Sequence, residues 1–314
     1  MEDKTGNKMR PAAVLIAGPT ASGKSALALA VADALGGAVV NADSMQVYAG
    51  LRVLTARPGD GDLERAPHLL YGHVPPGERY SVGRYLADAA ATIETCAKEG
   101  LVPIFAGGTG LYFKALLEGL SPIPQVPDAV RAQWDARLAA DGVATLRDIL
   151  AKVDPELAGR HRALDAQRLV RALGVHEATG RPLSAWQREP GVPLLDAART
   201  RRVFLDPDRE SLYRRIDARF EAMMAQGALD EVRALVAQAS DPSLPAMRAH
   251  GVPHLAAHLK GELSLAEAIA CAQADTRHYA KRQKTWFRHQ MADWESLDPD
   301  DENARDRWLT VLCR

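Results

Sequence analysis

The chain has 314 residues, of which 47% are hydrophobic and 25% charged, an ordinary composition for a globular protein with a sizeable core. Its formal net charge of −1 excludes a general electrostatic attraction to nucleic acid, so a polyanionic partner would need a local cluster of basic residues. Three widely spaced cysteines without a CxxC pair argue against a disulfide framework and favour the reducing cytoplasm. We expect neither a targeting signal nor a membrane span, because the N-terminal residues are polar and the apolar run after them is short.

Four short apolar runs have the character of buried parallel strands, because they are rich in Val, Ile, Leu or Phe and are separated by helical patterns. They lie at residues 13–17, 38–42, 101–106 and 202–206. This alternation predicts an α/β fold, with a P-loop NTPase-like parallel sheet flanked by helices.

Two groups of prolines enclose a stretch that has no strand signal. Proline and the residue before it resist helix formation, so these groups read as an entry and an exit linker. Between them apolar residues recur at helical spacing, which predicts an all-helical insertion. We therefore expect a core of residues 1–121 and 199–314, interrupted by a helical insertion at 122–198.

The sequence GPTASGKS at residues 18–25 follows the first predicted strand and precedes a helix expected to begin near Ala26. Strand, loop and helix are the context that the Walker A pattern requires. Gly18 and Gly23 allow the backbone to approach a phosphate closely, Lys24 adds a positive charge, and the Ser25 hydroxyl is a ligand suited to Mg²⁺. The pattern does not say whether the ligand is a nucleoside triphosphate or another diphosphate, and a glycine turn without a ligand is the alternative.

Two polar residues follow other predicted strands, where ligands of doubly wound sheets bind. Asp43 ends the run at 38–42 and could move a proton or hold a metal, or could merely cap a helix over residues 44–48. Thr109 follows the run at 101–106 and could instead cap the next helix. That run carries no terminal acid, which disfavours a motor or hydrolytic ATPase.

Six blocks stand in one order along residues 12–290, and together they resemble the tRNA dimethylallyltransferase (tRNA isopentenyltransferase) family. The blocks are GPTASGKS, NADSMQVY, GGTGLYFKALLEG, DAQRLVRAL, RIDARFEAMMAQG and TRHYAKRQKTWFR. The resemblance implies transfer of the dimethylallyl group of dimethylallyl diphosphate to the exocyclic amine of the adenosine 3′-adjacent to the anticodon.

The resemblance also implies roles for the residues already singled out. Asp43 matches the general base, Thr109 a polar residue near the attacking adenine, and Lys24 a group that stabilises the leaving diphosphate. The whole loop then binds diphosphate, with Mg²⁺ near Ser25. These loop residues are Gly18, Pro19, Thr20, Ala21, Ser22, Gly23, Lys24 and Ser25.

A larger set matches positions that contact the anticodon stem-loop of tRNA. The set comprises Asp43, Ser44, Met45, Gln46, Thr109, Arg131, Gln167, Arg168, Leu169, Val170, Arg171, Arg248, Lys281, Arg282, Gln283, Lys284, Thr285, Trp286, Phe287 and Arg288. Spacing puts Gln167 and Arg171 on one helix face, and a solvated helix face is the alternative for these side chains.

The C-terminal block supplies the basic cluster that the net charge requires. Residues 276–291 hold no acidic residue and interleave cations with aromatic side chains, the composition of a surface for unstacked RNA bases. The cations are Arg277, Lys281, Arg282, Lys284 and Arg288, and the aromatic residues are Tyr279, Trp286 and Phe287. An ordinary amphipathic helix with a basic face is the alternative.

One segment departs from the family. Relatives usually continue from the arginine matching Arg248 into Ile-Gly-Tyr and a basic residue, whereas this chain has His-Gly-Val-Pro at residues 250–253. Only Arg248 is carried over there as a tRNA contact. A metal site built from His250, His254 and His258 is disfavoured, because Pro253 interrupts a continuous helix between the first two.

Three rival functions remain open from the residues. A small-molecule kinase would share the loop but would not explain the basic block or the insertion. A prenyltransferase acting on free adenine nucleotides would not need the RNA contacts, and an RNA-binding protein with a vestigial loop would not need Lys24 and Ser25. We expect a monomer, because no helix shows a sustained heptad seam.

Overall fold

The structure is a computed structural model that describes residues 10–160, 165–238 and 241–313. The chain divides into two compact units, one formed by Met1–Leu117 with Leu194–Arg314 and the other by Glu118–Pro193. The second unit begins four residues and ends five residues before the bounds expected from the sequence.

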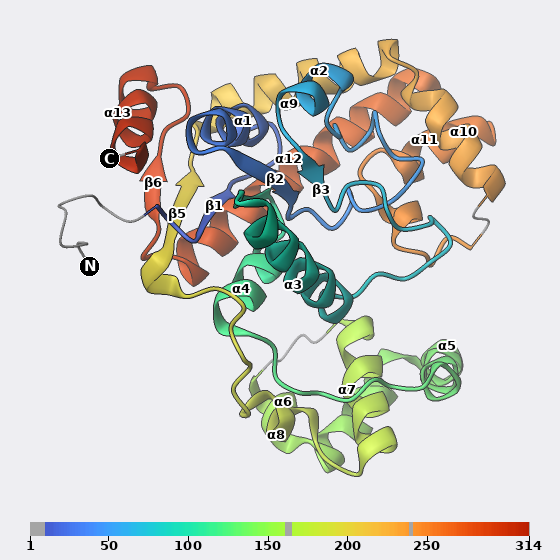
Figure 1. Ribbon diagram of the computed structural model, residues 1–314. Helices are drawn as coiled ribbons and strands as arrows, with labels where there is room; N and C mark the ends of the chain where they lie inside the picture. Colours follow the sequence, from blue (N-terminus) through green and yellow to red (C-terminus); the bar gives the residue numbers. More distant parts are fainter. Residues whose placement is uncertain (1–9, 161–164, 239–240, 314) are drawn as a thin grey trace. The chain divides into compact units, whose positions relative to one another are not determined.

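The first unit is built on a six-stranded sheet in which all paired strands are parallel, in the order β3-β2-β4-β1-β5-β6 (Figure 1). The strands are β1 (Ala13–Ala17), β2 (Gly37–Asn41), β3 (His68–Leu69), β4 (Val102–Gly107), β5 (Thr200–Leu205) and β6 (Glu295–Leu297). The four predicted strands are confirmed within two residues at each end. The edge strands β3 and β6 were not predicted, because two or three residues carry too little periodicity.

Nine helices longer than three residues belong to this unit in the described part of the chain. They are α1 (Lys24–Leu35), α2 (Asp60–Arg65), α3 (Val82–Glu99), α4 (Gly110–Glu118), α9 (Arg209–Ala225), α10 (Ala228–Gln238), α11 (Val252–Leu259), α12 (Leu265–Gln290) and α13 (Glu302–Cys313). Two short 3₁₀ turns lie at Ala197–Arg199 and Ala246–Arg248.

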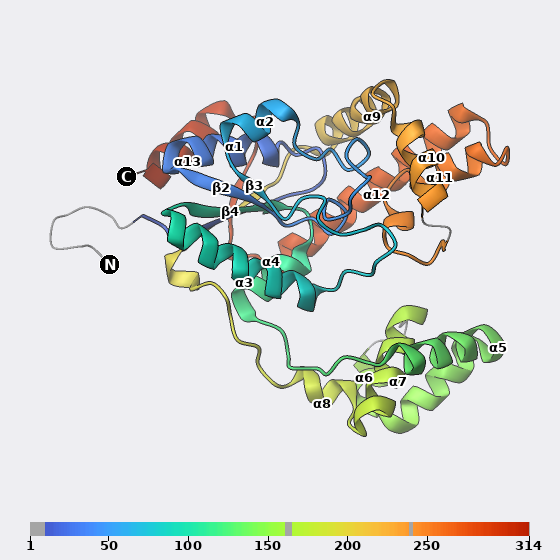
Figure 2. The same ribbon diagram turned by 45° about the vertical axis from the view of Figure 1, so that its right-hand side comes forward.

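Helices cover both faces of the sheet, since successive residues of a strand point to opposite sides. Val14 and Ile16 of β1 pack with α1 and α13, whereas Leu15 packs with α3, α4 and the C-terminal part of α12. Figure 2 shows α1 and α13 on one side of the strands and α3 and α4 on the other. Because the strands are parallel, the loop after β1 and the loop after β2 emerge at the same edge of the sheet, and helices cover both of its faces.

A third apolar cluster joins the loop after β2 to α9, α10, α11 and the N-terminal part of α12. Tyr48, Leu51 and Phe220 are buried in it. The carboxylate of Glu231 on α10 accepts hydrogen bonds from the backbone amides of Val53 and Leu54, each at 2.9 Å. This packing fixes the loop of residues 44–56 beside the strand ends.

The second unit is helical. Its helices are α5 (Asp128–Val153), α6 (Pro155–Arg160), α7 (Ala166–Thr179) and α8 (Leu183–Gln187). Gly142 interrupts α5 with φ 78° and ψ 171°. The buried Asp154 accepts hydrogen bonds from the backbone amides of Leu157 and Ser184, which ties α6 to α8. No helix in either described unit is both long and apolar enough to cross a membrane.

Candidate active site at the phosphate loop

The loop between β1 and α1 has the backbone that its glycines predicted. Gly23 has φ +88°, a left-handed conformation that glycine adopts without strain. A Cβ on Gly18 would lie 2.7 Å from Ser22 Oγ and 3.1 Å from Leu205 Cβ, so only glycine fits where the loop passes β5. Helix α1 begins at Lys24, two residues earlier than expected, so its N-terminal amides adjoin the loop.

Lys24 lies half-buried in the loop, and its Nζ donates a hydrogen bond to the carbonyl of Pro19 at 2.7 Å. Burial lowers the pKa of Lys24 to about 7, against an upward effect of Asp43 and a further downward effect of Arg219. The ammonium therefore gives up its proton easily in the free protein, and an anion bound beside it would restore the charge.

This pKa predicts that diphosphate binds more weakly as the pH rises. Above a pH of about 7 the free protein holds Lys24 largely neutral, so binding of inorganic diphosphate must take up a proton. We expect the Kd measured by calorimetry to rise with pH above neutrality, by up to about tenfold per pH unit. Lys24→Arg, which stays charged, should flatten this dependence. A Kd of the unchanged protein that is constant from neutral to alkaline pH would contradict the role given to Lys24.

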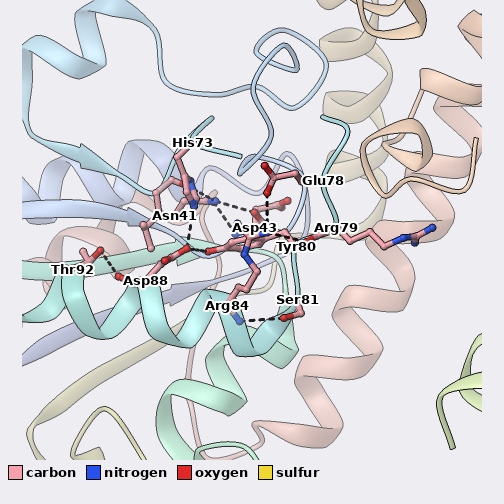
Figure 3. Close-up of polar contacts among 11 residues, drawn as sticks. Asn41, Asp43, His73, Glu78, Arg79, Tyr80, Ser81, Arg84, Asp88 and Thr92 are labelled. Carbon is pink, nitrogen blue, oxygen red and sulfur yellow. Dashed lines mark hydrogen bonds and ion pairs between the residues drawn. The ribbon is translucent and has the colours of Figure 1, made fainter. Parts of the chain in front are cut away.

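Asp43 follows the buried end of β2 and is held there by Asn41, which is 0% exposed. Asn41 Oδ1 accepts from the backbone amide of Asp43 at 2.8 Å, and its Nδ2 donates to the carbonyl of Asp43 at 2.9 Å (Figure 3). The same Nδ2 also donates to the carbonyl of Leu70 at 3.0 Å. The amide and the carbonyl of Asp43 are thus both hydrogen-bonded to Asn41, which fixes the backbone from which the carboxylate extends.

The Asp43 carboxylate caps a turn and also lines the pocket of the phosphate loop. Its Oδ1 accepts from the amide of Met45 at 2.9 Å, which caps a turn, since residues 44–47 do not form the helix considered from the sequence. The same side chain lines the pocket of the phosphate loop together with Lys24 and Ser25. A capping bond to one oxygen leaves the carboxylate free to accept a proton at the pocket.

Two hydrogen bonds link Thr109 to the backbone on either side of Asp43. Its Oγ1 accepts from the amide of Ser44 at 2.9 Å, and its own amide donates to the carbonyl of Ala42 at 3.1 Å. The hydroxyl therefore anchors the loop after β2 to the start of α4, which begins at Gly110.

Two pockets meet at Asp43. The first is lined by the phosphate loop, Asp43 and Arg215. The second has an apolar wall from Ile216, Phe220 and Met223 of α9. Both are lined by Thr20, Asp43, Thr55 and Arg219. The arrangement can hold an anion in one pocket and an apolar group in the other, with a carboxylate at their junction.

Arg219 is a site residue that the sequence reasoning missed. It donates a hydrogen bond to Thr20 Oγ1 in the loop, and burial lowers its pKa while Asp43 raises it. Arg215, one turn earlier on α9, keeps Nε and Nη2 buried without a hydrogen-bond partner among the described residues. The sequence did carry a signal for these two residues. Arg215 and Arg219 stand four residues apart in the block RIDARFEAMMAQG, which places both on one face of a helix.

The loop would bind Mg²⁺ only together with a phosphate-bearing ligand, because it supplies few oxygen donors of its own. Ser25 is exposed in the pocket that Asp43 also lines, and hydroxyl and carboxylate oxygens are donors that Mg²⁺ accepts. Among the residues that the structure describes, no group of three His, Cys, Asp or Glu side chains could hold a metal ion. Most of the coordination of Mg²⁺ here would therefore come from phosphate oxygens and water.

The basic cluster of α12 is partly neutralised by carboxylates from other segments. Lys284 and Arg288 pair with Asp206 at 2.9 and 2.7 Å, and Arg277 pairs with Asp217 at 2.5 Å. The two remaining cations, Lys281 and Arg282, are exposed and line a surface hollow together with Thr285 and Trp286. Trp286 is half-buried. The part of α12 open to an RNA is therefore narrower than the sequence suggested.

Two residues of α12 that were expected to contact tRNA are buried. Gln283, 5% exposed, accepts from the amide of Thr20 at 3.0 Å and donates to the carbonyl of Gly108 at 2.9 Å. It braces the phosphate loop against the loop after β4. Phe287, 1% exposed, packs under the sheet with Phe113 and Phe204. In the free protein both side chains are therefore closed to solvent.

Six expected tRNA contacts lie in the helical unit. On α7, Gln167, Arg168 and Arg171 are exposed, whereas Leu169 and Val170 are buried in the helical core, so these two side chains are closed to RNA. Arg131 on α5 is exposed and lies 3.7 Å from Asp135.

Three further expected tRNA contacts lie in the other unit. Arg248 is exposed, Met45 lines the apolar pocket, and Gln46 donates to the carbonyl of Thr55 at 2.8 Å.

The three histidines of the divergent segment have separate surroundings. His250 precedes α11, and its ring lies over that of Tyr279 with centroids 4.3 Å apart. His254 Nε2 pairs with Asp275 Oδ2 at 2.7 Å, and His258 Nδ1 contacts the carbonyl of Leu263 at 3.0 Å.

A parallel sheet with a glycine-rich loop before α1, and with the carboxylate that follows β2 in the same pocket, defines a P-loop protein that handles a phosphate-bearing ligand. The sequence matches the family described as IPP transferase over residues 46–290, and the description Isopentenyl transferase over residues 11–70. The chain belongs to the IPP transferase family, that of the tRNA dimethylallyltransferases.

Individual relatives agree along nearly the whole chain. The tRNA dimethylallyltransferase of Methylobacterium nodulans is 59% identical over 297 residues, covering 94% of this chain and 97% of the relative. That of Nitrobacter hamburgensis is 56% identical over 293 residues, covering 93% and 92%.

Solved structures share the fold. The tRNA isopentenylpyrophosphate transferase of Bacillus halodurans has 30% identity and a TM-score of 0.67, covering 98% of this chain and 95% of that one. A eukaryotic dimethylallyltransferase solved acting on tRNA has 26% identity and a TM-score of 0.78, covering 95% and 78%.

Proposed function

We propose that the protein transfers the dimethylallyl group of dimethylallyl diphosphate to the exocyclic amine of the adenosine 3′-adjacent to the anticodon in tRNA, and releases diphosphate. The observation that carries this proposal is the position of Asp43, which lines the phosphate-loop pocket with Lys24 and also the apolar pocket beside it. Relatives named tRNA dimethylallyltransferase, 56–59% identical, support it further.

The phosphate loop would hold the leaving diphosphate. Negative charge grows on that group as its bond to carbon breaks, so groups that face it stabilise the transition state more than the ground state. In this chain those groups are Lys24, Arg219 and the amides at the start of α1. Mg²⁺ bound near Ser25 and the diphosphate would supply further positive charge.

Asp43 would act as the general base. The lone pair of the adenine amine forms the new N–C bond, while the electron pair of the breaking C–O bond leaves with diphosphate. The amine becomes acidic as the new bond forms, and the Asp43 carboxylate takes its proton. Thr109 holds Ser44, the residue after this base, through its hydroxyl.

The target adenine is stacked in the anticodon loop and must turn out of the stack to reach Asp43. Lys281, Arg282 and Trp286 on α12 offer cations and an aromatic ring to unstacked RNA, and exposed Gln167, Arg168 and Arg171 offer a polar helix face in the helical unit. We further propose that the enzyme works as a monomer in the cytoplasm, where its tRNA substrate is found.

A labelling assay separates this function from its rivals. Dimethylallyl diphosphate carrying label in the dimethylallyl group, with Mg²⁺, should label unmodified tRNA. Label that passes to free AMP but not to tRNA would instead identify a nucleotide prenyltransferase. Transfer of the γ-phosphate of ATP alone would identify a small-molecule kinase, and RNA binding without any transfer would identify an RNA-binding protein whose phosphate loop is vestigial.

The two exposed cations of α12 without an ion pair among the described residues, Lys281 and Arg282, predict a defined salt effect. Replacing both Lys281 and Arg282 with alanine should weaken tRNA binding and lower the slope of log Kd against log salt by about 1 to 2, since up to two phosphate contacts are lost. Replacing Lys98 and Lys260, two exposed lysines outside α12, controls for the change in net charge. The same slope in the protein and in the α12 double variant would place the RNA elsewhere.

A further inference from the structure

The apolar pocket beside the phosphate loop contains one imidazole ring. His250 lines it together with Phe220, Met223 and Tyr279, and with Asp43 at its junction with the phosphate pocket. A titratable ring therefore lies next to the groups that take part in the proposed reaction. Neither the phosphate loop nor the base needs this ring, so it calls for an explanation of its own.

The backbone holds the His250 ring firmly in place. Its neighbours Ala249 and Val252 are 2% and 0% exposed, and the amide of Val252 donates to the carbonyl of Ala249 at 3.0 Å. Gly251 has φ +91°, and a Cβ there would come within 2.9 Å of the Phe220 ring. The imidazole is therefore fixed over Tyr279, at 4.3 Å between centroids and with planes tilted by 43°.

The surroundings of His250 favour an uncharged ring. No residue that the structure describes forms a hydrogen bond with its ring nitrogens. Burial lowers the pKa of His250, as do Arg282 and His254, while Asp43 and Asp275 raise it. The ring is thus neutral at neutral pH and becomes a cation only in acid, although it lies close to the Asp43 carboxylate.

We propose that the His250 ring, in tilted contact with Tyr279, forms a wall of the pocket for the dimethylallyl chain and permits transfer only while it is uncharged. This inference rests on the proposed function. As the C–O bond of the donor breaks, positive charge develops on the allylic carbons, and it disappears when the amine forms its bond and gives its proton to Asp43. A neutral aromatic wall tolerates that charge, whereas an imidazolium a few ångströms away opposes it.

Single-turnover transfer rates between about pH 5 and pH 8 test the proposal in wild-type protein and three variants. His250→Phe keeps an aromatic ring that cannot charge, so we expect a neutral-pH rate within about threefold of wild type and an acid-side midpoint lower by about half a pH unit or more. His250→Lys places a fixed cation there and should slow transfer about 30-fold or more without weakening tRNA binding. His258→Phe is the control, because His258 contacts the carbonyl of Leu263 and does not shift the pKa of His250, so this variant should keep the wild-type midpoint.

An identical acid-side midpoint in wild type and His250→Phe, a loss of more than about tenfold in His250→Phe at neutral pH, or a near-normal rate in His250→Lys would each overturn the inference. Transfer by the wild-type protein is measured first. Absence of transfer in wild type would contradict the proposed function, whereas the comparisons among variants test only the role of His250.

Wild-type protein gives a second readout that does not depend on a folded variant or on turnover. In an NMR titration of labelled histidines, dimethylallyl S-thiolodiphosphate, which binds but does not react, should leave His250 with a lower pKa than inorganic diphosphate does. Both compounds add negative charge, which raises the pKa, but only the first also covers the ring, which lowers it. An equal pKa of His250 with both compounds would show that the chain does not reach the ring.

Discussion

Asp43→Asn should lower the turnover of the protein by about 100-fold or more while tRNA affinity stays within a few-fold, the scale expected for the loss of a general base. Asparagine has nearly the same shape, and its Oδ1 can still accept the 2.9 Å hydrogen bond from the Met45 amide. The turn after β2 therefore survives, and only the capacity to take a proton is lost. Single-turnover transfer to tRNA, with tRNA affinity measured in parallel, checks this result.

The same variant separates the two roles of Asp43. If capping of the turn were its only role, asparagine would replace it with near-normal turnover. Asp43→Ala supplies the comparison, since it removes the cap as well as the base. Equal turnover in the asparagine variant and the unchanged protein would remove Asp43 from the chemistry.

Arg219→Ala should reduce kcat/KM for the donor by about 100- to 1,000-fold, because a half-buried cation that faces a leaving anion acts mainly in the transition state. Arg219 donates to Thr20 in the phosphate loop and lines both pockets, so its loss affects the site of the diphosphate directly. We expect kcat to fall along with affinity for the donor, and tRNA binding to change little.

Arg214→Ala is the matched control for Arg219→Ala, because Arg214 lies on the same helix α9 but is exposed to solvent. Its kinetics should stay within about twofold of the unchanged protein, as is usual for an exposed side chain. An Arg219→Ala protein that kept normal kcat/KM, with its fold verified by thermal unfolding, would mean that the diphosphate does not reach α9.

The elements next to the phosphate loop were predictable because their signals are local. The apolar run at residues 13–17, the glycines and Lys24 are contiguous, and they specify strand, loop and helix without help from distant residues. The same holds for Asp43, which directly follows β2. The short strands β3 and β6 pair only at the sheet edges, and their two and three residues carry no pattern of their own.

Contacts between distant segments decided the rest of the site. The basic block of α12 looked uniformly cationic in the sequence, yet Asp206 and Asp217, 60 or more residues away, neutralise three of its cations. Gln283 resembled an RNA contact, but its amide bridges Thr20 and Gly108. Such partners become visible only once the fold brings α12 under the sheet, which is also why Arg219 was missed.

A crystal structure of the protein with a tRNA anticodon stem-loop and dimethylallyl S-thiolodiphosphate is the most direct test of the central claim. We predict the diphosphate on the amides of the phosphate loop and Lys24, and the Asp43 carboxylate within about 3 Å of the exocyclic amine of an adenine turned out of its stack. A diphosphate bound away from Lys24, or an adenine amine facing a group other than Asp43, would contradict it.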